Sequence, residues 1–292
     1  MKPVPSENLK VTSNISLAET ATYIDLGMSE KKLVKSLEKT REELGELQNT
    51  LYAHGKYSVL VCIQGMDTAG KDSLIREVFK DFNVRGVEVH SFKVPTDIER
   101  RHDFLWRHYL ALPARGTFGV FNRTHYENVI VTRVHPEYIL GELLPDVNSL
   151  DDIDEEFWDK RFRQINSFEQ TLAENGTIIF KFFLHLSKDR QKYRLLRRLR
   201  KANKQWKFSP GDLEERKLWD DYQRCYEDAI NRTSTDDAPW YIIPADDKPA
   251  ARLMVASVLL DRMKTYTDIQ EPPLDPEVMA KIDEYKQQLE NE

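Results

Sequence analysis

Strand-like and helix-like hydrophobic patterns alternate along this chain, and together they predict an α/β fold. Short, largely apolar runs, which are typical of strands buried in a parallel sheet, occur at 58–63, 118–121, 177–186 and 238–243, and the mixed run VEVHSF at 87–92 predicts a further strand. Apolar residues three and four positions apart predict helices, the clearest at 29–54, 71–79, 97–112, 154–174, 187–208, 212–231 and 250–263. Because strands and helices alternate, we expect a central parallel sheet with helices on both faces.

The first predicted strand and the helix after it are joined by a glycine-rich loop, Gly65-Met66-Asp67-Thr68-Ala69-Gly70-Lys71. Its glycines let backbone N–H groups turn toward an anion, the new helix presents its positive end, and Lys71 adds a charge. The alternative is a glycine-rich turn with an incidental lysine. A strand before the loop and a helix after it are the context that phosphate-binding loops require, so we favour a phosphate-binding loop.

Two acidic residues distinguish this loop from the common form. Asp72 takes the place where most phosphate-binding loops carry a Ser or Thr hydroxyl for Mg²⁺. Asp67 lies within the loop, among donors meant for anions. A carboxylate facing bound phosphates is repulsive unless a divalent cation lies between them. We therefore expect Asp67 to act through Mg²⁺ and phosphoryl transfer to be the chemistry of the site.

Composition narrows the class of protein. With 292 residues, the chain can form one large domain or two. Its net charge of −6 argues against a general nucleic-acid coat. Cys62 and Cys225 have no metal-ligand spacing and suit a reducing cytosol, so we expect a cytoplasmic protein. The polar N-terminus and the lack of a long apolar run predict neither a leader nor membrane contact.

Residues 187–208 combine an apolar strip with an unusual density of positive charge. Five lysines occur there together with Arg190, Arg194, Arg197, Arg198 and Arg200. Such a face repels itself unless an anion neutralises it, so we favour anion binding over a merely solvated face. Nucleic acid is a competing polyanion, but Tyr193 and Trp206 are the only candidates for stacking on bases, and we expect no nucleic-acid partner.

Polar side chains also follow the third predicted strand. They occupy Asn122 to Glu127, directly after the apolar run at 118–121. Open α/β sheets place ligand-binding groups at the carboxyl ends of their strands. We therefore expect this segment to face the phosphate-binding loop, which follows the first strand.

Six segments in order resemble the polyphosphate kinase type 2 family, whose members move phosphate between inorganic polyphosphate and nucleotides. They are Gly65–Asp72, Asp103–Arg107, Phe121–Glu127, Val131–Pro136, Lys204–Ser209 and Ala238–Lys248. The resemblance implies a P-loop kinase-like α/β/α fold of three layers, similar to thymidylate kinase, with a helical lid at about 188–210. It implies one domain over 1–292: an arm and helix to 55, a kinase core over 56–265 and a charged helical tail over 266–292, which we expect to pack peripherally.

The resemblance and the loop together imply roles for individual residues. The implied catalytic residues are Asp67, Lys71, Asn122, Arg123, Arg133, Arg194 and Arg198. Those implied for nucleotide and phosphate binding are Gly65, Met66, Thr68, Ala69, Gly70, Asp72, Ser73, Phe104, Glu127 and Glu137. Those implied for polyphosphate are Lys71, Lys93, Arg107 and Arg123. Asp67 and Asn122 would hold Mg²⁺, with Mn²⁺ as an alternative ion.

Asn122 departs from the family, many of whose members carry Asp at this position as a second metal ligand. An amide offers a carbonyl oxygen but no negative charge, so metal affinity should fall unless Glu127 or Glu137 contributes. Alternatively, Asn122 only holds the end of the strand by hydrogen bonding. The pattern of Asn and Glu resembles the subgroup, class III, that accepts both AMP and ADP.

The function implied by the resemblance is reversible, Mg²⁺-dependent transfer of the terminal phosphoryl group of inorganic polyphosphate to ADP and AMP, forming ATP and ADP. Guanine nucleotides are further candidate acceptors, and the resemblance implies a homodimer or homotetramer. Two alternatives stay open. One is an ATP-dependent nucleoside monophosphate kinase, which the absence of Ser or Thr at position 72 disfavours. The other is a non-catalytic protein that binds nucleotides or polyanions.

Overall fold

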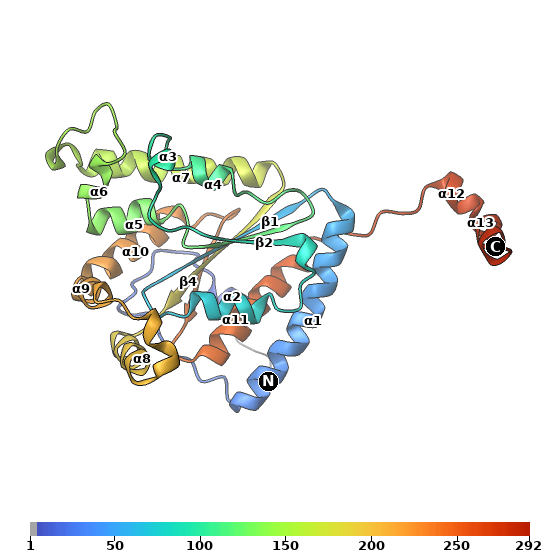
Figure 1. The fold of residues 1–292 in the computed structure, drawn as a ribbon, viewed down its shortest axis with the longest axis horizontal. Coiled ribbons are helices and arrows are strands. Elements are labelled where there is room, and N and C mark those ends of the chain that lie inside the picture. Colours follow the sequence, from blue (N-terminus) through green and yellow to red (C-terminus); the bar gives the residue numbers. More distant parts are fainter. Residues whose placement is uncertain (1–4) are drawn as a thin grey trace.

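Five parallel strands form the centre of the molecule (Figure 1). The computed structural model describes residues 5–292. Its strands are β1 (Ser58–Gly65), β2 (Val87–Ser91), β3 (Phe118–Asn122), β4 (Thr177–His185) and β5 (Trp240–Pro244). They lie in the order β2-β3-β1-β4-β5, and each neighbouring pair is parallel. The expected central parallel sheet is confirmed.

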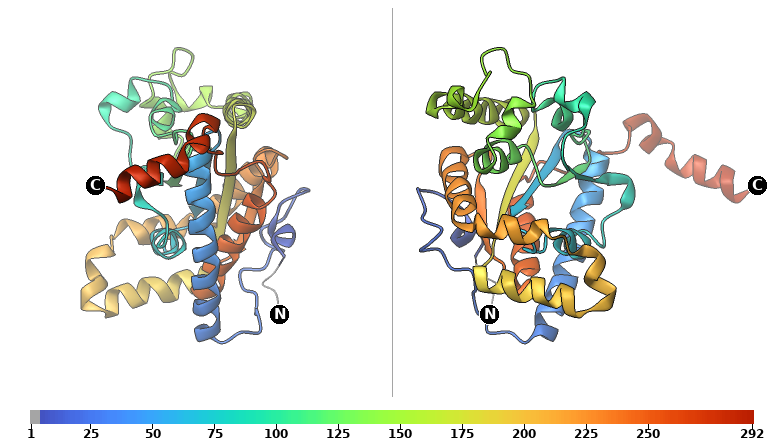
Figure 2. Two further views of the ribbon diagram at one scale, coloured as in Figure 1. Left: turned by 90° about the vertical axis from the view of Figure 1, so that its right-hand side faces the viewer. Right: turned by 60° about the vertical axis from the view of Figure 1, so that its left-hand side comes forward.

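Helices cover both faces of the sheet, which gives the three layers of an α/β/α fold (Figures 1 and 2). One face is covered by α1 (Glu30–His54), α2 (Lys71–Val78) and α11 (Lys248–Met263). The other is covered by α5 (Glu127–Val134), α7 (Glu155–Glu174) and α10 (Trp219–Thr233). The remaining α-helices are α3 (Asp97–Arg100), α4 (Trp106–Tyr109), α6 (Glu137–Leu140), α8 (Lys188–Arg200), α9 (Gly211–Lys217), α12 (Pro276–Ala280) and α13 (Ile282–Glu290).

The connection from α1 through β1 to α2 places the glycine-rich loop at the middle of the sheet. Gly55, with a φ of 67°, ends α1 in the left-handed conformation that favours glycine. All eight residues of β1 are buried, which explains why this strand reads as an unbroken apolar run. Because β1 pairs with β3 on one side and β4 on the other, its carboxyl end delivers Gly65–Lys71 to the centre of one sheet edge.

The segment 97–112, expected as one helix, forms the two short helices α3 and α4. Thr96 and Glu99 form a capping box at the start of α3. The chain then turns at Asp103, whose carboxylate accepts a hydrogen bond of 2.9 Å from the Leu105 N–H. An Asp side chain that bonds the backbone two residues on competes with the helical ladder, so the segment breaks there.

The segment 212–231 is also divided, into α9 and α10. The Leu218 N–H bonds to the Glu215 carbonyl oxygen at 3.2 Å, three residues back, which ends α9 in a tight turn. The chain changes direction at Leu218, and Trp219 and Tyr222 of α10 then become buried against the second core. Burial of these aromatic side chains therefore overrides a continuous helix.

The C-terminal tail extends away from the body of the molecule, contrary to the expected peripheral packing (Figures 1 and 2). Every residue from 270 to 292 is exposed. Its helices α12 and α13 are short, and their large apolar side chains are exposed: Val278, Met279, Ile282, Tyr285 and Leu289. Within residues 5–292, no helix has both the length and the apolar character needed to cross a bilayer.

Candidate active site

The loop between β1 and α2 has the backbone conformations that a phosphate cradle needs. Gly65 and Gly70 have φ values of 152° and 110°. A Cβ on Gly65 would lie 2.9 Å from the Leu184 carbonyl oxygen, so glycine is also required there for space. The first amides of α2, which begins at Lys71, have no partner within the helix and are available to an anion.

The ammonium group of Lys71 is folded back onto this loop. Nζ lies 2.5 Å from the carbonyl oxygen of Gly65 and 3.4 Å from that of Met66. Burial and the neighbouring Arg123 lower the pKa of Lys71. A bound phosphate would bring the opposite charge and favour the protonated form of this lysine.

Arg123 joins the two carboxylates nearest to the loop. Its Nη2 lies 3.4 Å from Asp67 Oδ1, and its Nη1 lies 3.2 Å from Glu127 Oε2. The pKa of Arg123 is raised, chiefly by Glu127 and also by Asp67. Its φ of 59° is uncommon for a residue other than glycine and indicates that the surrounding structure holds the backbone in place.

Asn122, at the end of β3, presents a free carbonyl oxygen beside carboxylates. Its Nδ2 donates to Asp72 Oδ1 at 2.9 Å and to Ser91 Oγ at 3.3 Å. Its Oδ1 is buried and has no hydrogen-bond partner within residues 5–292. An unpaired buried acceptor costs free energy unless a donor or a cation occupies it. Asp67, Asp72 and Asn122 all line one cavity, and their side-chain oxygens are the kind of ligand atom that a hard divalent cation such as Mg²⁺ prefers.

A buried polar network holds the segment that carries Asn122 and Arg123. Glu169 of α7 accepts hydrogen bonds of 2.7 Å from Tyr126 Oη and 2.5 Å from Lys181 Nζ, and it lies 3.0 Å from His125 Nε2. Burial would raise the pKa of Glu169, but Lys181 and His125 outweigh it and keep the pKa below its ordinary value. The charged network therefore fixes the turn from β3 into α5.

Helix α8 is attached to the glycine-rich loop through Arg194. Its Nη1 donates to the carbonyl oxygens of Thr68 and Ala69, both at 2.9 Å, and its Nη2 donates to that of Ala245 at 2.6 Å. Burial and the neighbouring Arg190 lower the pKa of Arg194 to about 10, so it remains charged at neutral pH. Arg194 therefore braces the loop.

Arg198, one turn further along α8, reaches across to the next helix. Its Nη1 lies 3.2 Å from Asp212 Oδ2 of α9 and 3.3 Å from the Lys207 carbonyl oxygen. The two arginines therefore hold α8 to different parts of the structure. Arg194 ties α8 to the loop, whereas Arg198 ties α8 to the segment that follows it.

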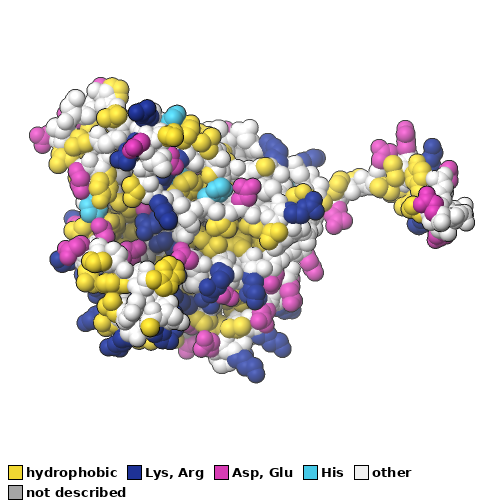
Figure 3. All heavy atoms as spheres, viewed as in Figure 1, with side chains coloured by type: hydrophobic (Ala, Val, Ile, Leu, Met, Phe, Trp, Pro, Cys, Tyr) yellow, Lys and Arg dark blue, Asp and Glu magenta, His cyan; other side chains and the backbone are white. Residues whose placement is uncertain are grey.

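Two cavities share three lining residues, Asp67, Arg123 and Asp212. The phosphate cavity, of about 640 Å³, lies between the loop, α8 and the start of α11 and is lined by ten basic and three acidic side chains. The aromatic cavity, of about 250 Å³, is lined by three tyrosines and two valines, and also by Arg123 and four carboxylates. In Figure 3, Lys and Arg side chains gather over α2 and α8. One cavity suits a polyanion and the other suits an apolar ring.

The sequence model of the family described as Polyphosphate kinase 2 (PPK2) matches residues 27–271 of the chain. This chain belongs to the polyphosphate kinase 2 family. The ADP-polyphosphate phosphotransferase of Rhodopseudomonas palustris is 44% identical over 276 residues, which cover 94% of each protein. The AMP/ADP-polyphosphate phosphotransferase of Meiothermus ruber is 45% identical over 79% of this chain and 81% of its own length.

Solved structures agree with this assignment. The polyphosphate kinase 2 of Arthrobacter aurescens TC1 superposes with a TM-score of 0.88 at 37% sequence identity, over 98% of this chain and 99% of the other. The fold predicted from the resemblance, a P-loop kinase-like arrangement, is therefore shown for this chain.

Most residues predicted for this kinase line the two cavities. In the phosphate cavity these are Asp67, Thr68, Gly70, Lys71, Asp72, Ser73, Asn122, Arg123, Arg194 and Arg198. In the aromatic cavity they are Gly65, Met66, Asp67, Arg123 and Glu127. Ala69 is buried within the loop. The structure therefore brings together groups that lie far apart along the chain.

Arg133 and Glu137 lie outside the lining of both cavities. Arg133 forms an ion pair with Asp228, and its guanidinium lies over the Trp158 ring at 5.7 Å from the centroid. Glu137 Oε1 lies 3.5 Å from Nδ1 of His135, a residue that does line the aromatic cavity. In this conformation Arg133 packs α5 against its neighbours.

Phe104, Lys93 and Arg107 are likewise outside both linings. Phe104 lies under the guanidinium of Arg161 at 4.1 Å. Arg107 donates to the Lys93 carbonyl oxygen at 2.9 Å, so these two residues form a local pair after β2. Their predicted roles toward nucleotide and polyphosphate stay predictions.

Lys248 is a site residue that the sequence reasoning did not assign. A Cβ on Gly70 would lie 3.4 Å from Lys248 Cε and 3.7 Å from its Nζ, so this side chain lies directly beside the loop. Burial, together with Arg194 and Arg252, lowers its pKa to about 8. The resemblance includes a segment that ends at Lys248, and that segment was the available signal.

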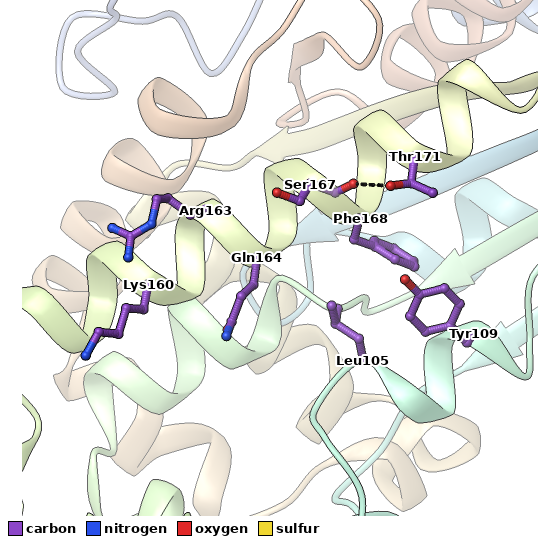
Figure 4. Close-up of a pocket in the computed structure, with 8 residues that line it drawn as sticks. All are labelled: Leu105, Tyr109, Lys160, Arg163, Gln164, Ser167, Phe168 and Thr171. Carbon is purple, nitrogen blue, oxygen red and sulfur yellow. Dashed lines mark hydrogen bonds between the residues drawn. The ribbon is translucent and has the colours of Figure 1, made fainter. Parts of the chain in front are cut away.

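A third hollow, of about 470 Å³, lies between α4 and α7 and contains no predicted site residue (Figure 4). Its α7 wall carries Lys160, Arg163 and Ser167, and Thr171 Oγ1 donates to the Ser167 carbonyl oxygen at 2.8 Å. Its other wall is formed by Leu105 and Tyr109.

Proposed function

We propose that this polyphosphate kinase 2 transfers the terminal phosphoryl group of inorganic polyphosphate to ADP and AMP. The observation that carries the proposal is the position of the glycine-rich loop between a strongly basic cavity and an aromatic one. A condensed phosphate chain needs cations along its length, whereas a nucleoside needs apolar and aromatic surface. The relatives from Rhodopseudomonas palustris and Meiothermus ruber, named for ADP and for AMP/ADP, support the same acceptors.

The donor phosphates would bind the loop amides and Lys71, and the acceptor phosphate would enter from the aromatic cavity. Phosphoryl transfer requires mainly position and charge neutralisation. Arg123 lies where both cavities meet and would hold donor and acceptor phosphates together. No side-chain base is needed, because the attacking nucleotide oxygen is already anionic at neutral pH. The same arrangement permits the reverse reaction.

Asp67 and Asn122, with Asp72 beside them, are the residues that would hold Mg²⁺ or, as its substitute, Mn²⁺. The ion would supply neutralisation of the phosphate charge. The Asp72 carboxylate accepts a hydrogen bond from Nδ2 of Asn122. The other end of the Asn122 amide, the unpaired carbonyl oxygen, therefore points away from Asp72. In this arrangement Asn122 both holds the strand end and offers a ligand.

The arginines of α8 would close the phosphate cavity and exclude water, which limits hydrolysis of the donor. Both arginines line the cavity; Arg194 also braces the loop through its carbonyl oxygens, whereas Arg198 is held by Asp212. Arg133, Glu137 and Phe104 keep the predicted roles toward the migrating group and the nucleotide. Guanine nucleotides as acceptors, a cytoplasmic location and a homodimer or homotetramer are retained as parts of this proposal.

The deciding experiment supplies purified protein with Mg²⁺, long-chain polyphosphate and either ADP or AMP, with no ATP added. We expect ATP from ADP, and ADP followed by ATP from AMP, measured by chromatography. An ATP-dependent nucleoside monophosphate kinase would instead require ATP as the donor. A non-catalytic binding protein would give no product with any donor, and that result would contradict the proposal.

A further inference from the structure

The C-terminal tail, residues 270–292, leaves the body of the molecule in a fixed direction. Just before it, Tyr57 Oη donates to Asp268 Oδ2 at 2.7 Å and ties the chain to the body. The segment Glu271–Pro276 then includes three prolines. A proline-rich linker is extended and semi-rigid, so it directs α12 and α13 away from their own body, as Figures 1 and 2 show.

The tail presents an apolar face that its own chain does not cover. Ile282, Tyr285 and Leu289 lie three and four positions apart on α13, so they share one face, and all three are exposed. In the described chain, 5–292, the hydrogen bonds and ion pairs formed after position 270 all stay within the tail. A helix as short as α13 is marginal in water by itself, so a surface that covers this face would stabilise it.

The charge of the tail indicates what kind of surface this is. Positions 275–292 carry six Asp and Glu side chains against two Lys, a net charge of −4, and Figure 3 shows acidic and apolar side chains together on the tail. Two such tails repel each other, and their apolar face is too short for a coiled coil. The tail therefore suits an apolar surface that is bordered by basic side chains.

The hollow between α4 and α7 has this character (Figure 4). Leu105 and Phe168 line it and are buried, and the Tyr109 ring packs on that of Phe168 with centroids 4.9 Å apart. Lys160 and Arg163 line it as well and are exposed. Among residues 5–292, no Asp or Glu lines the hollow, and Arg163 forms no ion pair. The hollow therefore complements the tail both in charge and in apolar character.

We propose that the tail of one copy of this chain packs α13 into the hollow between α4 and α7 of a second copy, so that two copies exchange their tails. A symmetric exchange fills one hollow on each copy and closes the contact. Tyr285 is the central side chain of the apolar face, and its ring would enter the hollow of about 470 Å³. The inference rests on the self-association retained in the proposed function and names the segment that produces it. This segment lies beyond the residues, 27–271, that match the family model.

Disulfide trapping between two differently tagged, co-expressed chains tests the contact. One chain carries Tyr285→Cys and the other Gln164→Cys, which lies in the hollow; both also carry Cys225→Ser, because that native thiol is only half-buried. Under mild oxidation we expect a covalent pair with one chain of each kind. Lys39→Cys, at an exposed position of α1, is the matched control for the hollow and should lose this product, because a disulfide requires Cα atoms within about 7 Å.

The strength of the contact can be measured without a crosslink. Tyr285→Ala should raise the dissociation constant of the paired copies about tenfold in sedimentation experiments, because an aromatic anchor is lost. Gln287→Ala, on the opposite side of α13, is the matched control and should leave the constant unchanged. ATP formation from ADP and polyphosphate by the same variants shows that they are folded.

Each contrary outcome has its own meaning. A covalent pair formed by Tyr285→Cys alone would mean that the tails pair with each other. An internal disulfide in the double variant Tyr285→Cys/Gln164→Cys would mean that the tail returns to its own body, and no product with Gln164→Cys would exclude the hollow. If the wild type self-associates and Tyr285→Ala behaves like it, the tail inference fails and the proposed function stands. If the wild type stays monomeric, the inference and the proposed oligomer fail together, while ATP formation still decides the phosphoryl transfer.

Discussion

The two cavities beside the glycine-rich loop share residues but differ in what they are built to hold. The phosphate cavity is lined by arginines and lysines from α2, α8 and α11. The tyrosines and valines of the aromatic cavity come from α5, α6, α10 and the segment after β2. Arg123 and Asp67 belong to both. This difference indicates that one reaction centre can bind its phosphate donor through charge and its nucleotide acceptor through aromatic stacking. The affinity for the donor and the affinity for the acceptor should therefore respond to different substitutions.

The largest effect is expected from Lys71, the lysine of the glycine-rich loop, which lines the phosphate cavity. Lys71→Ala should lower kcat at least about 10³-fold, because the charge that cradles the reacting phosphates is lost. The exposed lysine just after α2 provides a matched control, Lys80→Ala, which should stay near wild type. Circular dichroism and the melting temperature would show that both variants are folded. Near-wild-type turnover of Lys71→Ala would remove it from the site.

Asp67 and Asn122, which both line the phosphate cavity, should set the metal requirement. Asp67→Asn should lower kcat about 100-fold and raise the Mg²⁺ concentration for half-maximal rate, since a charged ligand becomes neutral. Asn122→Asp should have the opposite effect on the metal. Calorimetric titration with Mg²⁺ in the absence of substrates measures binding independently of turnover. If both variants bind Mg²⁺ as the wild type does, neither residue is a ligand.

A substitution in the aromatic cavity should separate acceptor from donor. Tyr138 is half-exposed and stacks on His135 with ring centroids 5.2 Å apart. Tyr138→Ala should raise the KM for ADP about tenfold, because an aromatic surface for the base is lost, and leave the KM for polyphosphate unchanged. Tyr109→Ala, in the hollow of Figure 4, is the control. An equal rise in both KM values would mean that the cavities are not separate sites.

The smallest effect is expected from a change of pH, which alters the charge of Lys248 and with it the KM for polyphosphate. Lys248 has a pKa of about 8, so it is protonated below pH 8 and loses its charge above it. The charged groups around it are Arg194, Arg197, Lys204, Asp247 and Arg252. The KM for polyphosphate should therefore rise about threefold between pH 7 and pH 9, while the KM for ADP changes less. Lys248→Arg keeps its charge over this range and should flatten the profile; a flat profile in the wild type would contradict the assignment.

The sequence was informative where one local pattern decides the outcome. Four of the five strands are largely buried apolar runs, so they and the parallel sheet could be predicted from the apolar pattern, whereas the residues of β2 are exposed or half-buried and gave a weaker signal. The glycine-rich loop was recognisable because its conformation depends on Gly65 and Gly70 themselves. The divided helices were not, since Asp103 and Leu218 end them through hydrogen bonds that apolar spacing does not reveal.

Site residues contributed by distant segments were the harder part. Lys248 reaches Gly70 only because α11 packs beside α2, and no local signal near either residue indicates this contact. Conversely, Arg133 reads as one more arginine for phosphate, yet Asp228 and Trp158 already neutralise and cover it in the fold. Charge in the sequence identified the candidates, and only tertiary packing could distinguish those that are free from those that are paired.

The hydrogen bonds of Arg194 restrict how the enzyme could open between turnovers. Releasing the first half of α8 would leave four carbonyl groups, two in the glycine-rich loop and two just after β5, without their Arg194 donor, at a cost of about 1–3 kcal/mol each. The chain beyond Arg198 is held mainly through Asp212, a contact that can break and reform cheaply. Substrate entry would thus move only the segment that follows Arg198, with a hinge near that residue. The backbone amides of the glycine-rich loop, which bind the donor, would keep their positions throughout the cycle.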